Sequence, residues 1–242
     1  MRNATDEQID EDEPLWRYFK IERFIDLLAS GELYFASARQ FQDPFEGATA
    51  VLPQGAYIDP RYPLHEEPGE RAFEDLRRMM KVCCWHRASY ESDAMWQLYA
   101  GERKGVAVKT TPGRLSASAS TFRLEPQHQG EDLWGGNVKY VDLLTERLRI
   151  NALGRFWHKH MAFSWEREFR LGISLRFAEE FGVAIPEEGI RVAFNIDQLV
   201  DRIFLGPSLE QEEVQLIRQA AERAGVGERV RVSSMLGTPR YT

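Results

Sequence analysis

Short aromatic and β-branched runs alternate irregularly with amphipathic helical patterns along this chain, and this order most constrains its fold. The chain lacks the regular strand–helix–strand repeat of a parallel sheet, so we predict an α+β fold with mixed, mainly antiparallel sheets and flanking helices. Helical spacing covers 21–30, 72–80, 92–99, 144–160 and 209–224. Strand patterns cover 14–19, 33–36, 82–85, 105–109, 138–143, 165–175, 190–195, 203–205 and 230–233.

The length fits a single folded domain after a short tail. The chain has 242 residues, of which 43% are hydrophobic and 29% charged, as in ordinary globular proteins. Residues 1–13 are rich in acids and poor in apolar side chains, so we expect a disordered acidic tail followed by one α+β domain over 14–242. Four prolines over 52–69 indicate a surface excursion.

Charge and hydropathy narrow the partners that we expect. The net charge is −7, and most of it comes from the acidic tail, so the body is nearly balanced and has no strong nucleic-acid signature. No run approaches the ~20 apolar residues of a membrane span, and the start is not that of a signal peptide. Adjacent Cys83 and Cys84 suit a reduced compartment. We therefore expect a cytoplasmic protein without a membrane partner.

The segment 163–171 is the most informative one for chemistry. As a strand it would carry Glu166, Glu168 and Arg170 on one face, with the two carboxylates roughly 7 Å apart. Such a pair could stabilise a developing cation in a cleft. The alternative is a solvated face on which Glu168 and Arg170 form an ordinary surface pair.

A second carboxylate pair, Asp43 and Glu46, lies in the turn Asp43-Pro44-Phe45-Glu46. One interpretation is that Asp43 caps this turn; the other is that both acids join Glu166 and Glu168 in one cleft or around a hard divalent ion. In the predicted helix His158 and His160 would not share a face, so we predict no metal site from them.

Three aromatic or basic positions could serve either a core or a ligand. Trp96 and Tyr99 share one helix face, as core residues or as a ligand platform. Arg17 points away from Trp16 and Tyr18 in its strand, which suggests a buried carboxylate or a ligand phosphate as its partner. The Gly-rich fingerprints of dinucleotide-binding and P-loop proteins are absent.

Ordered motifs over about residues 15–234 resemble those of a bacterial family known as domain of unknown function 2971. The resemblance is carried by Leu15-Trp16-Arg17-Tyr18, Gly31-Glu32-Leu33-Tyr34-Phe35-Ala36-Ser37, Phe41-Gln42-Asp43-Pro44-Phe45-Glu46, Met95-Trp96-Gln97-Leu98-Tyr99, Gly105-Val106-Ala107-Val108, Trp165-Glu166-Arg167-Glu168-Phe169-Arg170-Leu171 and Ile203-Phe204-Leu205-Gly206-Pro207. The family name implies no activity.

The layout is also similar to that of mono-ADP-ribosyltransferases, with Arg17 in an early strand, Ser37 in the next and Glu166 and Glu168 later. That likeness implies NAD as substrate: Glu168 would hold the ribose and stabilise the cation, Glu166 would orient the acceptor, and Arg17 would hold the phosphates. Tyr34 or Trp96 would stack on nicotinamide. The residues expected to bind NAD are Arg17, Tyr18, Tyr34, Ser37, Trp96, Tyr99 and Arg170.

Three functions follow as hypotheses. The first is an ADP-ribosyltransferase-like enzyme or NAD glycohydrolase, of the kind used as a toxin or anti-phage effector, with an acceptor that the sequence does not identify. The second is a metal-dependent hydrolase or nuclease built on Asp43, Glu46, Glu166 and Glu168. The third is a non-catalytic binding module in which these residues form a buried network with Arg17.

Overall fold

The computed structural model describes residues 1–50 and 68–241. It divides into two compact units, which we call unit 1 and unit 2. Unit 1 comprises Met1–Gln8, Tyr34–Cys83 and Thr121–Ile190, and unit 2 comprises Ile9–Leu33, Cys84–Ser120 and Arg191–Thr242. The proline-rich excursion predicted at 52–69 lies outside the described residues, apart from its last two positions, which begin a helix.

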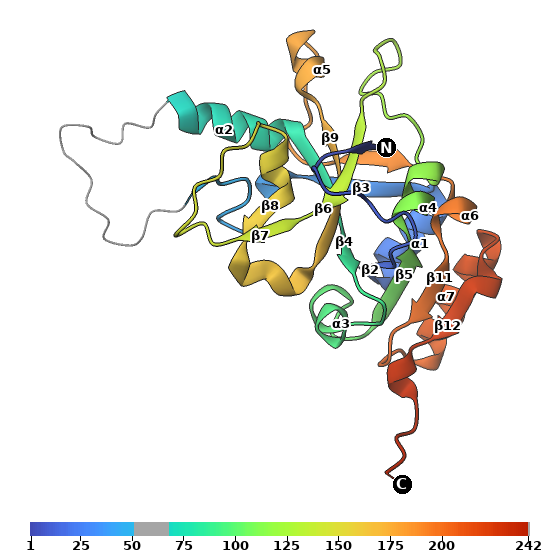
Figure 1. Ribbon diagram of the computed structural model, residues 1–242. Helices are drawn as coiled ribbons and strands as arrows, with labels where there is room; N and C mark the ends of the chain where they lie inside the picture. The colour runs from blue at the N-terminus through green and yellow to red at the C-terminus, as the bar shows by residue number, and fades with distance from the viewer. Residues whose placement is uncertain (51–67, 242) are drawn as a thin grey trace. The chain divides into compact units, whose positions relative to one another are not determined.

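Unit 1 contains an antiparallel pair, β6–β9, that β1 extends in parallel. A separate parallel pair, β7–β8, is visible in Figure 1. The elements of unit 1 are β1 (Arg2–Asn3), η1 (Ala38–Gln40), α2 (Pro68–Met79), β6 (Leu133–Asn137), β7 (Lys139–Val141), η2 (Gly154–Trp157), β8 (His158–His160), η3 (Met161–Glu166), β9 (Glu168–Ser174) and α5 (Arg176–Glu180).

Trp157 anchors the segment that carries β8 to the β6–β9 pair. Its side chain is fully buried, and its indole N–H donates a hydrogen bond to the Arg170 carbonyl at 3.4 Å. The ring lies over Gly136 and Gly172, where a Cβ would approach it to 3.3 and 2.6 Å. Glycine at these strand positions therefore makes room for the indole and brings the start of β8 onto β9.

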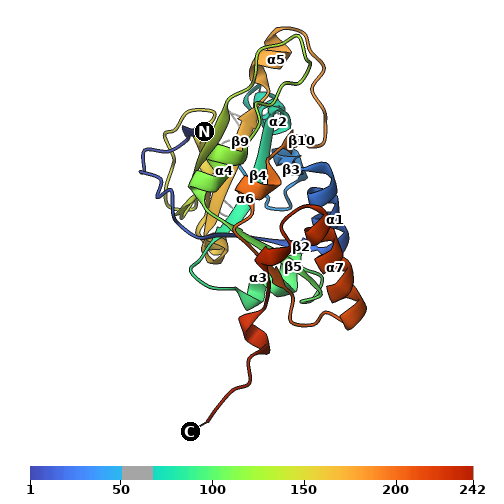
Figure 2. The same cartoon turned by 90° about the vertical axis from the view of Figure 1, so that its right-hand side faces the viewer.

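Unit 2 is built on an antiparallel run β2–β5–β11, to which β12 adds in parallel. Helices α1 and α7 pack together beside it (Figure 2). The elements of unit 2 are β2 (Leu15–Lys20), α1 (Ile21–Ser30), α3 (Asp93–Tyr99), β5 (Gly105–Thr110), α4 (Pro112–Ser118), α6 (Ile196–Leu199), β11 (Arg202–Leu205), α7 (Gln211–Arg223), η4 (Gly227–Arg229), β12 (Val230–Val232) and η5 (Ser234–Leu236).

Local sequence signals explain several of these boundaries. Helix α1 buries Phe24, Leu27 and Leu28 and ends at Gly31, whose positive φ of 68° lets its N–H donate to the Leu27 carbonyl. Ser92 caps α3 by accepting from the Met95 N–H.

Three strands have residues in both units: β3 (Glu32–Ser37), β4 (Met80–Arg87) and β10 (Ile190–Ala193). With these, antiparallel pairings outnumber parallel ones among the described strands. The prediction of an α+β fold with mainly antiparallel sheets and flanking helices is confirmed. Within the described part of the chain, no helix combines the length and apolar character needed to cross a bilayer.

Two local predictions outside the segment 163–171 differ from the structure. Disorder is expected at 1–13, yet Arg2–Asn3 forms β1 on β6, with Arg2 paired to Asp132 at 2.9 Å and stacked over Trp134. The helix predicted over 144–160 is wrong: the segment holds only η2 before it becomes strand β8. Two aromatic residues of this segment, Phe156 and Trp157, contact β9 from the single turn η2. Their apolar spacing therefore reflects contacts of a turn and not the face of a helix.

Candidate functional site

A buried ionic network lies in unit 1, centred on two neighbouring side chains of β9. Glu168 and Arg170 lie on one face of the strand, and the Arg170 Nε donates to Glu168. The other end of the guanidinium donates to both carboxylate oxygens of Glu46, at 2.6 and 3.0 Å, and to the Phe156 carbonyl at 2.7 Å. Arg170 and Glu46 are fully buried, so this half of the network has its charges paired away from water.

Lys159 links the two predicted glutamates. Strand β8 turns Lys159 away from His158 and His160, and the Lys159 Nζ donates to Glu166 and, at 3.2 Å, to Glu168. The ammonium also lies 4.6 Å from the centre of the Phe163 ring. We name Lys159, Glu166 and Glu168 the lysine–glutamate centre.

Glu166 reaches this centre from a turn and not from a strand, so the strand predicted over 163–171 is wrong in its first half. The 3₁₀ helix η3 ends at Glu166, and Arg167 follows in the left-handed region at φ 45° and ψ 54°. Only at Glu168 does the regular strand begin. Glu166 and Glu168 therefore lie on either side of a left-handed residue, and both contact Lys159 although they do not belong to one regular strand.

The turn 43–46 brings the other two predicted carboxylates to the same network. Asp43 caps the turn, because its Oδ1 accepts from the Phe45 N–H at 2.8 Å. Its Oδ2 lies 3.9 Å from the Lys159 Nζ and has no hydrogen-bond partner in the described structure. Both alternatives therefore apply to Asp43, which caps its turn and also lies with Glu46, Glu166 and Glu168 around two cations, Lys159 and Arg170.

The environment pushes the two glutamate pKa values in opposite directions. Burial, together with the hydrogen bond and charge of Glu168, raises the pKa of Glu166 to about 7 despite Lys159. Burial would raise the pKa of Glu168 too, but the charges of Arg170 and Lys159 lower it below its ordinary range. Burial opposes the charged form of Lys159, yet Glu168 and Glu166 raise its pKa. Near neutral pH Glu168 is ionised and Glu166 can exchange a proton.

This shift predicts how stability changes with pH. The Glu166 pKa is raised in the folded state from an ordinary value near 4.5 to about 7, so its contribution to stability is full below pH 4.5 and is lost as the pH rises toward 7. The free energy of unfolding of wild type, minus that of Glu166→Gln, should decline over this interval. Urea unfolding at pH 4.5, 5.5, 6.5 and 7.5 measures it. A difference that is constant with pH would contradict the raised pKa.

Arg17, Tyr18, Trp96 and Tyr99, predicted as NAD-binding residues, belong to unit 2. The Arg17 guanidinium stacks on the rings of Phe19 and Trp85, at 5.3 and 5.9 Å. Tyr18 and Trp96 are buried and meet edge to face at 4.9 Å, and the Tyr18 hydroxyl accepts from the Ser92 N–H. Tyr99 is half-exposed. Tyr18 and Trp96 thus have the contacts of core residues.

Tyr34 and Ser37 are also predicted to bind NAD. In unit 1 their side chains make hydrogen bonds within the protein. The Tyr34 hydroxyl donates to the Gln40 side chain and accepts from the Gly189 N–H at 2.9 Å. Ser37 is buried, and its hydroxyl donates to the Arg77 carbonyl at 3.1 Å. These hydrogen bonds tie β3 to the segment at 189 and to the end of α2.

Sequence reasoning missed Lys159 and Tyr140. The Tyr140 hydroxyl accepts from the Glu168 N–H at 2.8 Å and so fixes the start of β9. The triplet His158-Lys159-His160 could have indicated the role of Lys159, because in a strand the lysine lies on the opposite face from both histidines. In that strand His160 stacks on Phe45 at 5.0 Å, which places it beside the turn 43–46.

The four carboxylates already have cationic partners. Lys159 and Arg170 stand between them, so a divalent ion would have to displace an ammonium or guanidinium group. Over residues 1–50 and 68–241, no group of three or more His, Cys, Asp or Glu side chains has the geometry to hold a metal ion.

Comparison with known proteins adds no functional assignment. No protein-family model matches the sequence, and no curated protein matches it either. The likeness to domain of unknown function 2971 and to mono-ADP-ribosyltransferases therefore stays a prediction, and the lysine–glutamate centre itself has to support any functional proposal.

Proposed function

We propose that the lysine–glutamate centre is an acid–base site that cleaves the bond between nicotinamide and ribose in NAD. The observation that carries this proposal is the contact between Glu166 and Glu168 with opposite pKa shifts. Two neighbouring carboxyl groups whose environments push their pKa values apart are typical of acid–base sites, in which one group holds or takes a proton while the other stays ionised. The choice of NAD rests on the likeness to mono-ADP-ribosyltransferases that the sequence predicts.

The reaction assigns a separate role to each side chain. Nicotinamide leaves with the electron pair of the N-glycosidic bond and becomes neutral, while positive charge develops on the ribose. Water or an acceptor hydroxyl attacks the ribose carbon, and Glu166, partly ionised near pH 7, takes the released proton. Glu168 stays ionised between Arg170 and Lys159, so it holds Lys159 against Glu166 as a positioning residue.

Nicotinamide release from NAD tests this proposal. We expect Glu166→Gln to reduce the rate about 100-fold, the size of a typical general-base contribution. Glu222→Gln, at an exposed position of α7, is the matched control and should keep the wild-type rate. The proposal fails if wild type releases no nicotinamide, or if Glu166→Gln releases it at the wild-type rate while both proteins are folded.

A non-catalytic role is the second candidate, and the complete burial of Arg170 and Glu46 favours it. In that case the network would serve to fix the turn 43–46 on β9. Glu166→Gln would then melt below wild type, whereas NAD would shift neither melting temperature. A shift with NAD in wild type that weakens in Glu166→Gln would instead support the enzyme.

A further inference from the structure

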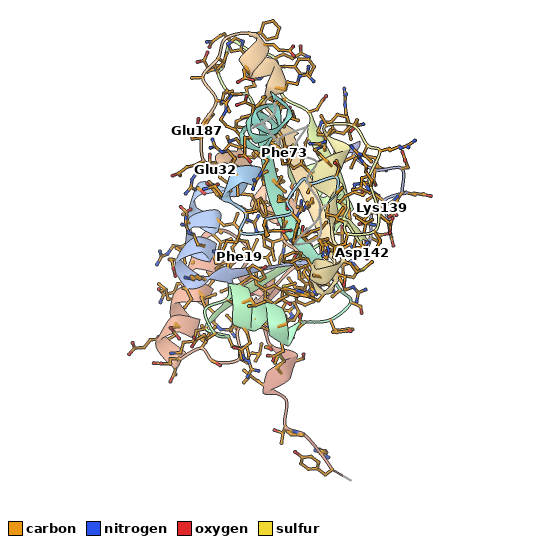
Figure 3. All side chains as sticks on the ribbon, turned by 90° about the vertical axis from the view of Figure 1, so that its left-hand side faces the viewer. Phe19, Glu32, Phe73, Lys139, Asp142 and Glu187 are labelled. Atoms are coloured by element: carbon orange, nitrogen blue, oxygen red, sulfur yellow. The ribbon has the colours of Figure 1, made fainter. Side chains whose placement is uncertain are left out.

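Arg155, on η2 of unit 1, is a half-buried cation without a charged partner among the described residues. Its guanidinium carbon lies 4.9 Å from the centre of the Phe73 ring, which Figure 3 labels on α2. The Arg155 Nε is buried and has no hydrogen-bond partner in the described structure. Among the described residues, the Arg155 guanidinium thus interacts by stacking on the Phe73 ring.

Other half-buried arginines of unit 1 have their charge satisfied. Arg77 donates to Glu74 at 3.0 Å and to the Ala38 carbonyl, and Arg78 pairs with Glu179. For Arg155 burial alone lowers the pKa, and no described carboxylate compensates. A desolvated cation costs stability unless an anion lies beside it, so a bound anion next to the Arg155 guanidinium would relieve that cost.

Packing holds the Arg155 guanidinium in place. Gly47, at φ 76°, contacts the Phe73 ring on one side and the Phe156 ring on the other: a Cβ there would lie 2.9 and 3.1 Å from them. Glycine at this position lets the two aromatic rings close around the turn that follows Glu46. Phe156, next in the chain to Arg155, gives its carbonyl to Arg170. The backbone next to Arg155 is therefore tied to the buried network, and the Phe73 ring under its guanidinium is itself packed against Gly47.

We propose that Arg155 binds a phosphate group of a small ligand. A guanidinium stacked on an aromatic ring keeps its edge free for two parallel hydrogen bonds, the geometry that matches phosphate oxygens. The stack limits the side-chain freedom that is lost on binding. This inference is independent of the NAD reaction, because it rests on unit 1 contacts that do not include Glu166 or Glu168.

Calorimetric titration with pyrophosphate and, separately, with ADP-ribose tests the site. We expect wild type to bind at least one of them, and Arg155→Met to weaken that affinity at least 10-fold. Arg155→Lys, which keeps the charge but not the planar fork, should lie between them. Arg218→Met, an exposed position of α7, removes the same charge as a control and should bind like wild type. If ADP-ribose binds and pyrophosphate does not, the site recognises the phosphate only as part of a nucleotide ligand. If both bind, the site recognises the phosphate group itself.

The melting temperature without ligand separates this role from a structural one. Methionine keeps an apolar side chain over Phe73 and removes the desolvated charge, so Arg155→Met should melt at or above the wild-type temperature. A fall of several degrees would make Arg155 a structural residue and overturn the proposal. The proposal is equally overturned if wild type binds neither ligand with a Kd below about 1 mM, or if Arg155→Met binds as tightly as wild type.

Discussion

Arg170→Met lowers the free energy of unfolding by about 3–5 kcal/mol, because it leaves buried carboxylates without their cation. Arg170 is fully buried and donates to Glu168, to both oxygens of Glu46 and to the Phe156 carbonyl. Methionine fills much of the same volume, so the loss comes mainly from uncompensated charge and from unmade hydrogen bonds. Urea unfolding at pH 7 measures it.

Two comparisons isolate this effect. Arg176→Met breaks an exposed pair with Glu180 and should cost less than about 0.5 kcal/mol. The double variant Arg170→Met/Glu46→Gln should lose less stability than the sum of its single variants, since each removes a charge that the other needs. A loss below about 1 kcal/mol in Arg170→Met would show that water or other groups compensate the carboxylates, and would contradict a buried network.

Trp96→Ala also costs about 3–5 kcal/mol, through a cavity in the core of unit 2. The indole is fully buried, meets Tyr18 edge to face, and donates from Nε1 to Glu91 at 3.1 Å. Glu91 in turn accepts from the Ser233 and Ser234 hydroxyls, so the truncation also weakens the attachment of the C-terminal segment.

Leu98→Ala is the control for Trp96→Ala, because Leu98 lies on the same helix and is 60% exposed. It should change the free energy of unfolding by about 0.5 kcal/mol or less. Trp96→Phe should recover part of the loss, since it restores apolar volume without the N–H donor. If Trp96→Ala unfolds at the same urea concentration as Leu98→Ala, Trp96 is not a core residue and its role as a ligand platform regains support.

The order of strands and helices could be predicted because periodicity and capping are local signals. Helices α1 and α3 and strand β5 lie where apolar spacing over 21–30, 92–99 and 105–109 predicts them. The gathering of Asp43, Glu46, Glu166 and Glu168 was anticipated from their residue type, not from geometry. Their clustering depends on long-range packing that spacing along the chain does not encode.

The cations of the site were harder to predict, for a physical reason. Lys159 lies at the end of the predicted helix 144–160, where its spacing does not relate it to the glutamates, and it faces them from strand β8. In the segment 163–171, strand alternation would place the odd-numbered residues on one face, and Arg167 is the one charged residue among them. That misfit marks the position where the backbone turns left-handed and the strand pattern stops.

The interleaving of the two units along the chain has a consequence for biosynthesis. Each unit takes three separate stretches of sequence, and the first stretch of unit 2 ends at Leu33 while its last begins at Arg191. At a translation rate of about 5–20 residues per second, the ribosome needs roughly 8 to 30 s to synthesise what lies between them. During that interval the apolar surface of β2 and α1 lacks the part of its core that β11 and α7 supply. Neither unit is a contiguous fragment of the gene, so each depends on the nascent chain staying unaggregated until its final stretch emerges.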